Sequence, residues 1–324
     1  MNRRAFIAQA GGALAWPIAW PALAAGVAHI GFLGAASAAR YAAEIEALRF
    51  GLRDLGYVEG NNLSIDFRWA EGQYDRLPEL ARDLVDRKVD VLVTHGTPGA
   101  LAAERATTTV PIVMAIIGDP VATGVVSNIS HPDRNITGSS FFAPELTAKR
   151  VEVIKEAVPA LRRIGLLTNG ANPVMAPILA AVARRATALG AEAQAFPIRS
   201  AADLDAAFTA MKSARIDALV IPEDGMLIAN IAAVARTTAS RSVPAIGFGQ
   251  FAKAGGLMAY GVNIPQTFRY AATFIDKILK GAKPQELPIE QATRFELIIN
   301  AKAEKALGLS LPTTLLARAD EVIE

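Results

Sequence analysis

Short apolar runs alternate along this chain with longer segments in which apolar residues recur every three or four positions. Residues 29–34 form a short apolar run, and residues 63–69 alternate apolar and polar side chains, which is the period of a strand. Between them, residues 41–57 place Ile45 and Leu48 on one face of a helix. Because strands and helices keep alternating, we predict a parallel sheet with helices on both faces.

The same order of predicted strands and helices begins again at residue 163, so the second half of the chain repeats the pattern of the first half. The run 163–168 is similar to 29–34, and three types of residue recur at offsets of 134, 127 and 133 positions. The recurring pairs are Gly56 and Gly190, Asp90 and Asp217, and Pro111 and Pro244. Any two α/β halves share an order of elements, but the matched residues favour a structural repeat. We therefore expect an α/β fold of two similar, doubly wound parallel-sheet lobes with a cleft between them.

One loop, at residues 89–107, suggests a site for a polar group. We expect a strand over 89–93, a turn over 94–99 and a helix from Ala100. Backbone N–H groups at a helix start, together with the Thr97 hydroxyl, can hold a carboxylate without any arginine. The alternative is that Thr97 only caps the helix.

Further candidates lie where other strands are expected to end, because ligands of open parallel sheets bind beyond the carboxyl ends of the strands. Glu223 and Asp224 can accept hydrogen bonds from an ammonium or hydroxyl group, or form a solvated turn. Phe248 can pack on an apolar ligand or in the core. Asp119 and residues 135–140 are interpreted mainly as lip and hinge elements. The full set of predicted ligand-binding residues is Gly34, Ser37, Thr94, His95, Gly96, Thr97, Pro98, Asp119, Asn169, Asn172, Glu223, Asp224 and Phe248.

Sequence signatures of catalysis and of cofactor binding are missing. The chain has neither G-x-x-x-x-G-K-[ST] nor G-x-S-x-G, and the loop after residues 29–34 lacks the G-x-G-x-x-G spacing. Its three histidines show no metal-ligand spacing, and His95 has no evident nucleophile beside it. The chain has no cysteine, which excludes a thiol nucleophile and disulfides. We expect no enzymatic activity, no cofactor and no metal.

Residues 1–24 have the features of an export signal. Arg3 and Arg4 precede an apolar run that ends in Ala-Leu-Ala, a cleavage pattern, and the paired arginines are similar to a twin-arginine signal. An ordinary secretory signal is the alternative. Cleavage would leave 300 of the 324 residues, with 31 basic residues after loss of these two from 33, against 31 acidic ones. This balance favours neither nucleic acid nor an anionic membrane as partner.

Long stretches resemble the ABC transporter substrate-binding protein family, which includes tryptophan/tyrosine-type periplasmic solute-binding proteins. The strings "GTPGALAAERATTTVPIVMA", "GDPVATGVVSNISHPDRNITG" and "KRVEVIKEAVPALRRIGLL" carry the resemblance, and Asp133-Arg134 departs from it where the family usually has glycines. The resemblance implies a type I periplasmic-binding-protein fold, with residues 25–142 plus about 264–297 in one lobe and 143–263 plus about 298–324 in the other. It places the ligand at Thr97, Pro98, Asp119, Asn172 and Asp224.

The resemblance implies a monomer in the periplasm that delivers a small solute to a membrane permease with its own ATPase. Two alternatives stay open: a periplasmic subunit that presents a ligand to a membrane receptor, and an enzyme that uses the same cleft. A carboxylate cradle opposite acidic residues makes an amino acid the first expectation for the ligand and an aromatic carboxylate the second. Hinge closure on the solute is the expected mechanism.

Overall fold

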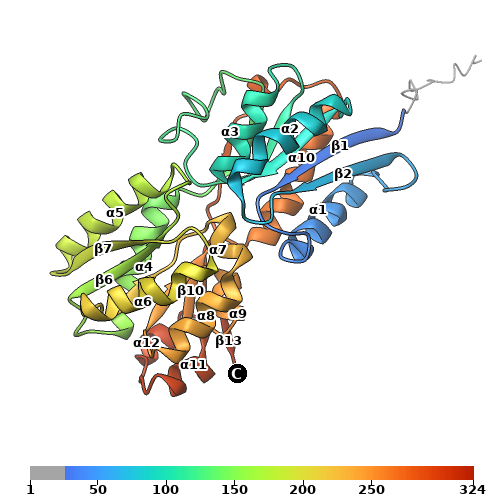
Figure 1. Cartoon of the computed structure of the whole chain (residues 1–324). Helices are drawn as coiled ribbons and strands as arrows, with labels where there is room; N and C mark the ends of the chain where they lie inside the picture. Colours follow the sequence, from blue (N-terminus) through green and yellow to red (C-terminus); the bar gives the residue numbers. More distant parts are fainter. Residues whose placement is uncertain (1–25) are drawn as a thin grey trace, which may run out of the picture.

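Residues 26–324 are described by the structure, a computed structural model (Figure 1). The predicted export signal at 1–24 lies outside the described residues. Within 26–324, no helix combines the length and the apolar character that crossing a bilayer requires.

The N-terminal lobe is built on a six-stranded parallel sheet in the order β11-β5-β4-β3-β1-β2. Helices α2 and α3 lie together on one face, and α1 and α10 pack against each other on the opposite face (Figure 1). The strands are β1 (Ala28–Gly34), β2 (Leu63–Trp69), β3 (Val91–His95), β4 (Ile112–Ile117), β5 (Ile136–Ser140) and β11 (Glu290–Gln291). The helices are α1 (Ala42–Asp54), α2 (Leu77–Asp86), α3 (Gly96–Ala106) and α10 (Ile264–Leu279), with short 3-10 turns η1 (Tyr74–Arg76) and η3 (Pro284–Glu286).

The C-terminal lobe repeats this plan on a seven-stranded sheet in the order β13-β12-β10-β9-β8-β6-β7. Only the β10–β12 pair in it is antiparallel. Its strands are β6 (Arg163–Thr168), β7 (Glu192–Pro197), β8 (Ala218–Val220), β9 (Ala245–Gly247), β10 (Met258–Gly261), β12 (Glu296–Asn300) and β13 (Glu321–Ile323). Its helices are α4 (Ala143–Ala157), α5 (Met175–Ala188), α6 (Leu204–Ser213), α7 (Gly225–Ala229), α8 (Ile231–Ser240), α9 (Gly249–Lys253), α11 (Ala301–Ala306) and α12 (Thr313–Leu316), with η2 (Ala201–Asp203).

The recurring residues of the two halves hold equivalent positions, which confirms the predicted fold of two similar lobes. Asp90 accepts a hydrogen bond from the amide of His29 at the start of β1 (2.8 Å), and Asp217 accepts one from the amide of Arg163 at the start of β6 (2.8 Å). Gly56 and Gly190 both have positive φ, 90° and 69°, just after α1 and α5. Each half therefore begins its first strand and ends its first helix in the same way.

The chain crosses between the sheets three times: after β5, after β10 and after β11. The interpretation of residues 135–140 as a hinge was wrong, because 136–140 are the buried strand β5. Gly138 explains the missed strand. Its φ is 139°, and a Cβ there would stand 2.0 Å from the carbonyl oxygen of Met114, so only glycine lets β5 pair so closely with β4. The exact lobe boundaries stay a prediction.

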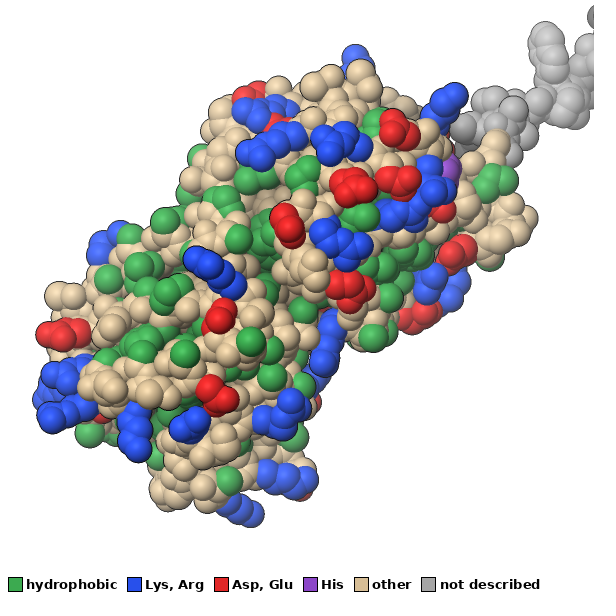
Figure 2. Space-filling view, in the orientation of Figure 1, with side chains coloured by type: hydrophobic (Ala, Val, Ile, Leu, Met, Phe, Trp, Pro, Cys, Tyr) green, Lys and Arg blue, Asp and Glu red, His purple; other side chains and the backbone are tan. Residues whose placement is uncertain are grey.

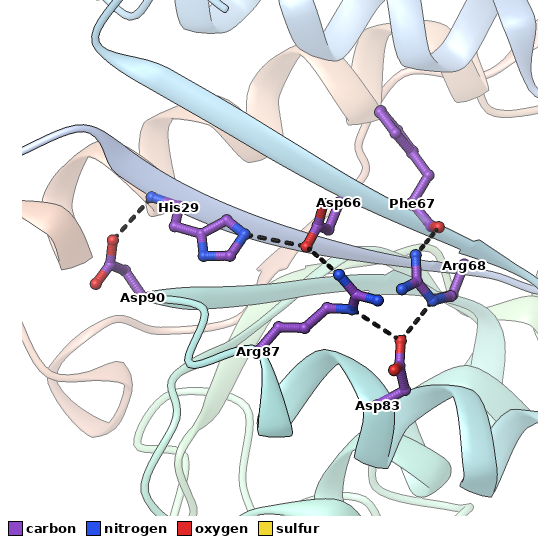
Figure 3. A network of polar contacts seen from close by, with 7 residues as sticks. All are labelled: His29, Asp66, Phe67, Arg68, Asp83, Arg87 and Asp90. Carbon is purple, nitrogen blue, oxygen red and sulfur yellow. Dashed lines mark hydrogen bonds and ion pairs between the residues drawn. The ribbon is translucent and has the colours of Figure 1, made fainter.

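A polar network covers the outer edge of the N-terminal sheet (Figure 3). Asp66 on β2 contacts His29 (3.2 Å) and Arg87 (3.5 Å), and Asp83 on α2 accepts from Arg87 (3.1 Å) and Arg68 (2.5 Å). The hydrogen bond from Arg87 is the main cause that lowers the pKa of Asp83. Charged side chains on an edge strand discourage pairing with a second chain. Acidic and basic groups are interspersed over this face of the molecule (Figure 2), so we interpret the network as structural.

Candidate functional site

A cavity of about 50 Å³ lies where the strand ends of the two lobes meet. Its wall is mostly apolar, with polar groups at the start of α3 and of α7. It is lined by Ala35, Tyr41, Tyr74, His95, Gly96, Thr97, Pro98, Ile116, Gly118, Phe141, Ala143, Asn172, Val174, Glu223, Asp224, Gly225, Ile228 and Ile264.

The structure brings together part of the predicted ligand-binding set. The predicted residues in the cavity wall are His95, Gly96, Thr97, Pro98, Asn172, Glu223 and Asp224. The others in the set, all of them described residues, lie outside this wall: Gly34, Ser37, Thr94, Asp119, Asn169 and Phe248.

The residues outside the wall have other partners. The Thr94 hydroxyl donates to the carbonyl of Leu33 (3.0 Å), and Asp119 accepts from the amide of Ala122 in its own turn (2.9 Å). Phe248 is fully buried in the core of the C-terminal lobe. Gly34 packs against Trp69, since a Cβ at this position would clash with the ring. The carbonyl of Ser37 accepts hydrogen bonds that close the turn before α1. The Nδ2 of Asn169 donates to the carboxylate of Asp224 (3.2 Å).

Helix α3 begins at Gly96, four positions before the predicted start at Ala100, and its N-cap is His95. The prediction failed because His95 belongs to β3, and Gly96 with φ 69° makes the transition from strand to helix without a longer turn. Thr97 therefore lies inside the first turn and is not the cap. Its buried Oγ1 has no hydrogen-bond partner among the described residues.

The start of α3 offers donors to the cavity. The first N–H groups of a helix have no partner within the helix, and Pro98 has no N–H, so Gly96 and Thr97 supply the free ones. The dipole of the helix favours negative charge at the same place. A buried hydroxyl that lacks a partner costs free energy, and a ligand oxygen would satisfy it. The arrangement suits a carboxylate.

His95 is neutral at physiological pH. Burial lowers its pKa to about 3, and its ring packs against Tyr41 with centroids 4.2 Å apart. Its Nε2 accepts a hydrogen bond from the amide of Ala35 (3.1 Å), which leaves the ring proton on Nδ1. His95 is thus a fixed wall residue with one N–H to donate, and it is unsuited to general-base chemistry.

Asp224 is the polar centre of the opposite wall, and it is 3% exposed, which excludes the alternative of a solvated turn. It caps α7, where its Oδ1 accepts from the amides of Met226 (2.9 Å) and Leu227 (3.1 Å). Its Oδ2 accepts from the Nδ2 of Asn172 (2.9 Å) and from the hydroxyl of Tyr74 (2.8 Å). These donors are neutral, so they hold the carboxylate without cancelling its charge.

Tyr74 reaches this carboxylate from the other lobe, in η1, and also accepts from the amide of Met226 (3.1 Å). Burial, and next the charge of Asp224, raises the pKa of the Tyr74 hydroxyl well above its ordinary value, so it stays a donor. Sequence reasoning missed Tyr74, because it stands in a segment that reads only as the start of a helix. It is a direct link between the lobes across the cavity.

Glu223 differs from its neighbour because its charge is cancelled. Arg150 on α4 is fully buried, and it forms an ion pair with both carboxylate oxygens of Glu223. Sequence reasoning also missed Arg150, which lies 73 positions away in the chain. Since no cation pairs with Asp224 among the residues that the structure describes, Asp224 alone gives the cavity wall a net negative charge.

The site thus combines donors for an anionic group on one lobe with an uncancelled carboxylate on the other. A ligand that carries both an anionic and a cationic group would satisfy both ends. Within residues 26–324, no cluster of His, Cys, Asp and Glu has the arrangement of a metal site. The cavity is about a third of the 150 Å³ that accommodates benzene, so it has no room for an organic solute in this arrangement of the lobes.

Comparison with known proteins agrees with this architecture. A solved structure described as an ABC domain in complex with L-Trp, from Streptococcus pneumoniae, has a TM-score of 0.83 and 27% identity and covers 91% of this chain and 100% of its own. A conserved domain protein from Vibrio cholerae has a TM-score of 0.86 and 28% identity, covering 91% of this chain and 99% of its own. A tyrosine-binding protein of Clostridioides difficile is 26% identical over 259 residues, which are 80% of this chain and 74% of that protein.

A family model described as ABC transporter substrate binding protein matches residues 37–323, nearly the whole described chain. The match includes every residue that lines the cavity except Ala35. The chain belongs to the ABC transporter substrate-binding protein family.

Proposed function

We propose that this protein captures an α-amino acid, with an aromatic side chain as the first candidate, in the cavity between its lobes. The donors at the start of α3 would hold the carboxylate, and Asp224 would hold the ammonium group. The observation that carries this proposal is the buried hydroxyl of Thr97, which has no partner in the described part of the chain. The relatives that bind L-Trp and tyrosine support the ligand class.

The same proposal covers the route of the solute. The protein is exported to the periplasm and closes on its ligand. It then delivers the ligand to a membrane permease that has its own ATPase, and it performs no catalysis. A ligand that contacts both lobes favours the closed state by its differential affinity for that state. Membership of the substrate-binding family supports this route. The lowered pKa of His95, which makes it unsuited to general-base chemistry, supports the absence of catalysis.

Replacing Thr97 with valine should separate binding from folding. The substitution keeps the shape and removes an unpartnered polar atom, so stability should be unchanged or higher. The lost hydrogen bond to a carboxylate should weaken binding of L-tryptophan or L-tyrosine by about 1.5–3 kcal/mol, or about 10- to 150-fold. Isothermal calorimetry gives the affinity, and thermal unfolding gives the stability.

Thr238→Val is the matched control, since that buried hydroxyl already donates to the carbonyl of Ala235 (2.8 Å) far from the cavity. It should lower stability and leave affinity unchanged. Tryptamine lacks the carboxylate and indole-3-propionate lacks the ammonium group, so each should bind far more weakly than L-tryptophan. Equal affinity of the Thr97→Val variant and the wild type for every amino acid that binds would refute the carboxylate cradle.

A further inference from the structure

A second contact joins the lobes on the side of the cleft where α1 faces α9. The Nε2 of Gln250 on α9 donates to the Oε1 of Glu44 on α1 at 2.5 Å. Glu44 is only 1% exposed, although it is an acidic residue in the first turn of its helix. The two groups come from different lobes, so this contact exists only while the lobes are closed.

The contact leaves two buried acceptors without a donor. The second carboxyl oxygen of Glu44, Oε2, has no hydrogen-bond partner among the described residues, and neither has the amide oxygen of Gln250. An ionised carboxylate and an amide oxygen are both acceptors, so they cannot satisfy one another. If Glu44 were ionised, the closed state would bury a negative charge and leave two oxygens, Glu44 Oε2 and Gln250 Oε1, without hydrogen-bond donors.

A single proton on Glu44 removes both the buried charge and the two unsatisfied acceptors. If Oε2 carries it, the carboxylic acid donates to the amide oxygen of Gln250 while the amide donates to Oε1, and the two groups form a ring of two hydrogen bonds. We propose that Glu44 takes up one proton from solvent when the lobes close, and that the acid–amide pair with Gln250 makes ligand capture favour low pH. This inference rests on the proposed function, because it concerns regulation of the same closure.

The surroundings of Glu44 agree with a neutral carboxyl group. Burial, the largest effect, raises its pKa, and the hydrogen bonds from its own backbone amide and from Gln250 only partly oppose the rise. Tyr41 is the buried N-cap residue of α1, and burial, followed by the charge of Glu44, raises the pKa of its hydroxyl. When the lobes part, the carboxyl group meets water, and its pKa returns toward the ordinary range.

Other charged groups near this contact have their own partners or face open space. Arg40, Lys253 and Glu296 line a cavity of about 490 Å³ between α1, α9 and α10, and Glu44 and Gln250 line the same cavity. Lys253 pairs with Glu321 (3.4 Å), and Glu296 accepts from the Nδ2 of Asn263 (3.1 Å). In the described part of the chain, no ion pair joins Arg40 or Lys253 to Glu44. No neighbouring cation therefore holds Glu44 in its charged form.

The sign of the pH dependence follows from linkage. The closed state has the higher Glu44 pKa, so the extra stability of closure is complete below the open-state pKa and is lost as the pH rises through the closed-state pKa. For one linked proton, the closure constant falls by at most tenfold per pH unit between the open-state pKa and the closed-state pKa, and it is constant above both. His95 does not titrate in this range, since its pKa is about 3.

The test measures closure directly and does not depend on a ligand. Since the chain has no cysteine, spin labels can be placed at Asp86→Cys on α2 and Lys212→Cys on α6, which are exposed positions on the two lobes. Electron paramagnetic resonance then gives the distribution of distances between the labels at pH 5, 6.5 and 8. The closed fraction of the wild type should fall as the pH rises.

The Glu44→Gln substitution supplies the second donor permanently, because a primary amide at this position can donate to Gln250. The closed fraction of this variant should be independent of pH and at least as large as that of the wild type at pH 5. Glu46→Gln is the matched control on the same helix: Glu46 is exposed and contacts Arg53 (3.2 Å), so this variant should keep the dependence of the wild type. Circular dichroism checks that each variant is folded.

Three results would overturn the inference: a closed fraction of the wild type that is constant from pH 5 to 8, a Glu44→Gln variant that keeps the wild-type dependence, or a closed fraction set by the concentration of Na⁺ or K⁺ and not by pH. Calorimetry with L-tryptophan at the same pH values forms a second arm. If closure depends on pH through Glu44 and no amino acid binds at any pH, the proton inference stands and the proposed ligand class fails.

Discussion

Replacing Gly225 with alanine should hold the lobes apart and weaken ligand binding by about 5- to 150-fold. A Cβ at Gly225 would stand 2.7 Å from the Cβ of Ala35 and 3.0 Å from the hydroxyl of Tyr74, and both neighbours belong to the other lobe. Overpacking of this kind costs about 1–3 kcal/mol. The cost arises only on closure, because the C-terminal lobe by itself has room for the methyl group.

Small-angle X-ray scattering should show a larger radius of gyration for the Gly225→Ala variant than for the wild type, and calorimetry should show its weaker binding of L-tryptophan. Thermal stability should stay level or rise, since alanine is the better helix former at the first position of α7. Gly249→Ala is the matched control. Gly249 begins α9 in the same way, and a Cβ there would make only an ordinary contact, 3.5 Å from Ile298.

A variant that closes normally and binds like the wild type would mean that the lobes do not need to approach this closely. The two contacts across the cleft, from Tyr74 to Asp224 and from Gln250 to Glu44, would then not be needed for ligand capture. The Gly225 result thus decides whether the closed arrangement of the lobes is the state that holds the ligand.

The sequence predicted the layered fold well because apolar residues recur along the chain with the period of each element. Alternation over 63–69 matched β2 at both ends, and the repeat pairs Asp90 and Asp217 mark the same strand start in each lobe. The prediction of an element was wrong where a single glycine with positive φ allowed a backbone geometry that the sequence pattern does not indicate. Gly96 starts α3 without the expected turn, and Gly138 lets β5 pair where a hinge was expected.

The sequence predicted the loops that reach the candidate site, but it did not predict the partners that those loops contact. Strand ends located Thr97 and Asp224, because the topology alone brings those loops to the cleft. The partners that decide their chemistry are far away in the chain: Tyr74 is 150 positions from Asp224, and Arg150 is 73 from Glu223. No local pattern shows that one of two adjacent acids is paired with an arginine while the other is not.

Replacing Arg150 with methionine should produce the largest loss of stability among these variants, about 3–5 kcal/mol. The guanidinium donates to the carbonyls of Tyr260 (2.7 Å) and Ile221 (3.0 Å) as well as to Glu223, which is itself almost buried. Methionine fills similar space but leaves an uncompensated carboxylate beside Asp224 in the cavity wall. Urea unfolding followed by circular dichroism measures the loss.

The double variant Arg150→Met/Glu223→Leu should recover a substantial part of that stability, because it removes the unpaired charge and leaves only the carbonyls without donors. Arg318→Met is the surface control: its pair with Glu156 is half exposed, so its loss should cost at most about 1 kcal/mol. The single variant adds the unpaired charge of Glu223 to the cavity wall, whereas the double variant is neutral there, as the buried pair is. The double variant should therefore also bind L-tryptophan more tightly than the single variant does. If the double variant is as unstable as the single one, the loss arises from the orphaned carbonyls, and Glu223 is not the reason that Arg150 is buried beneath the site.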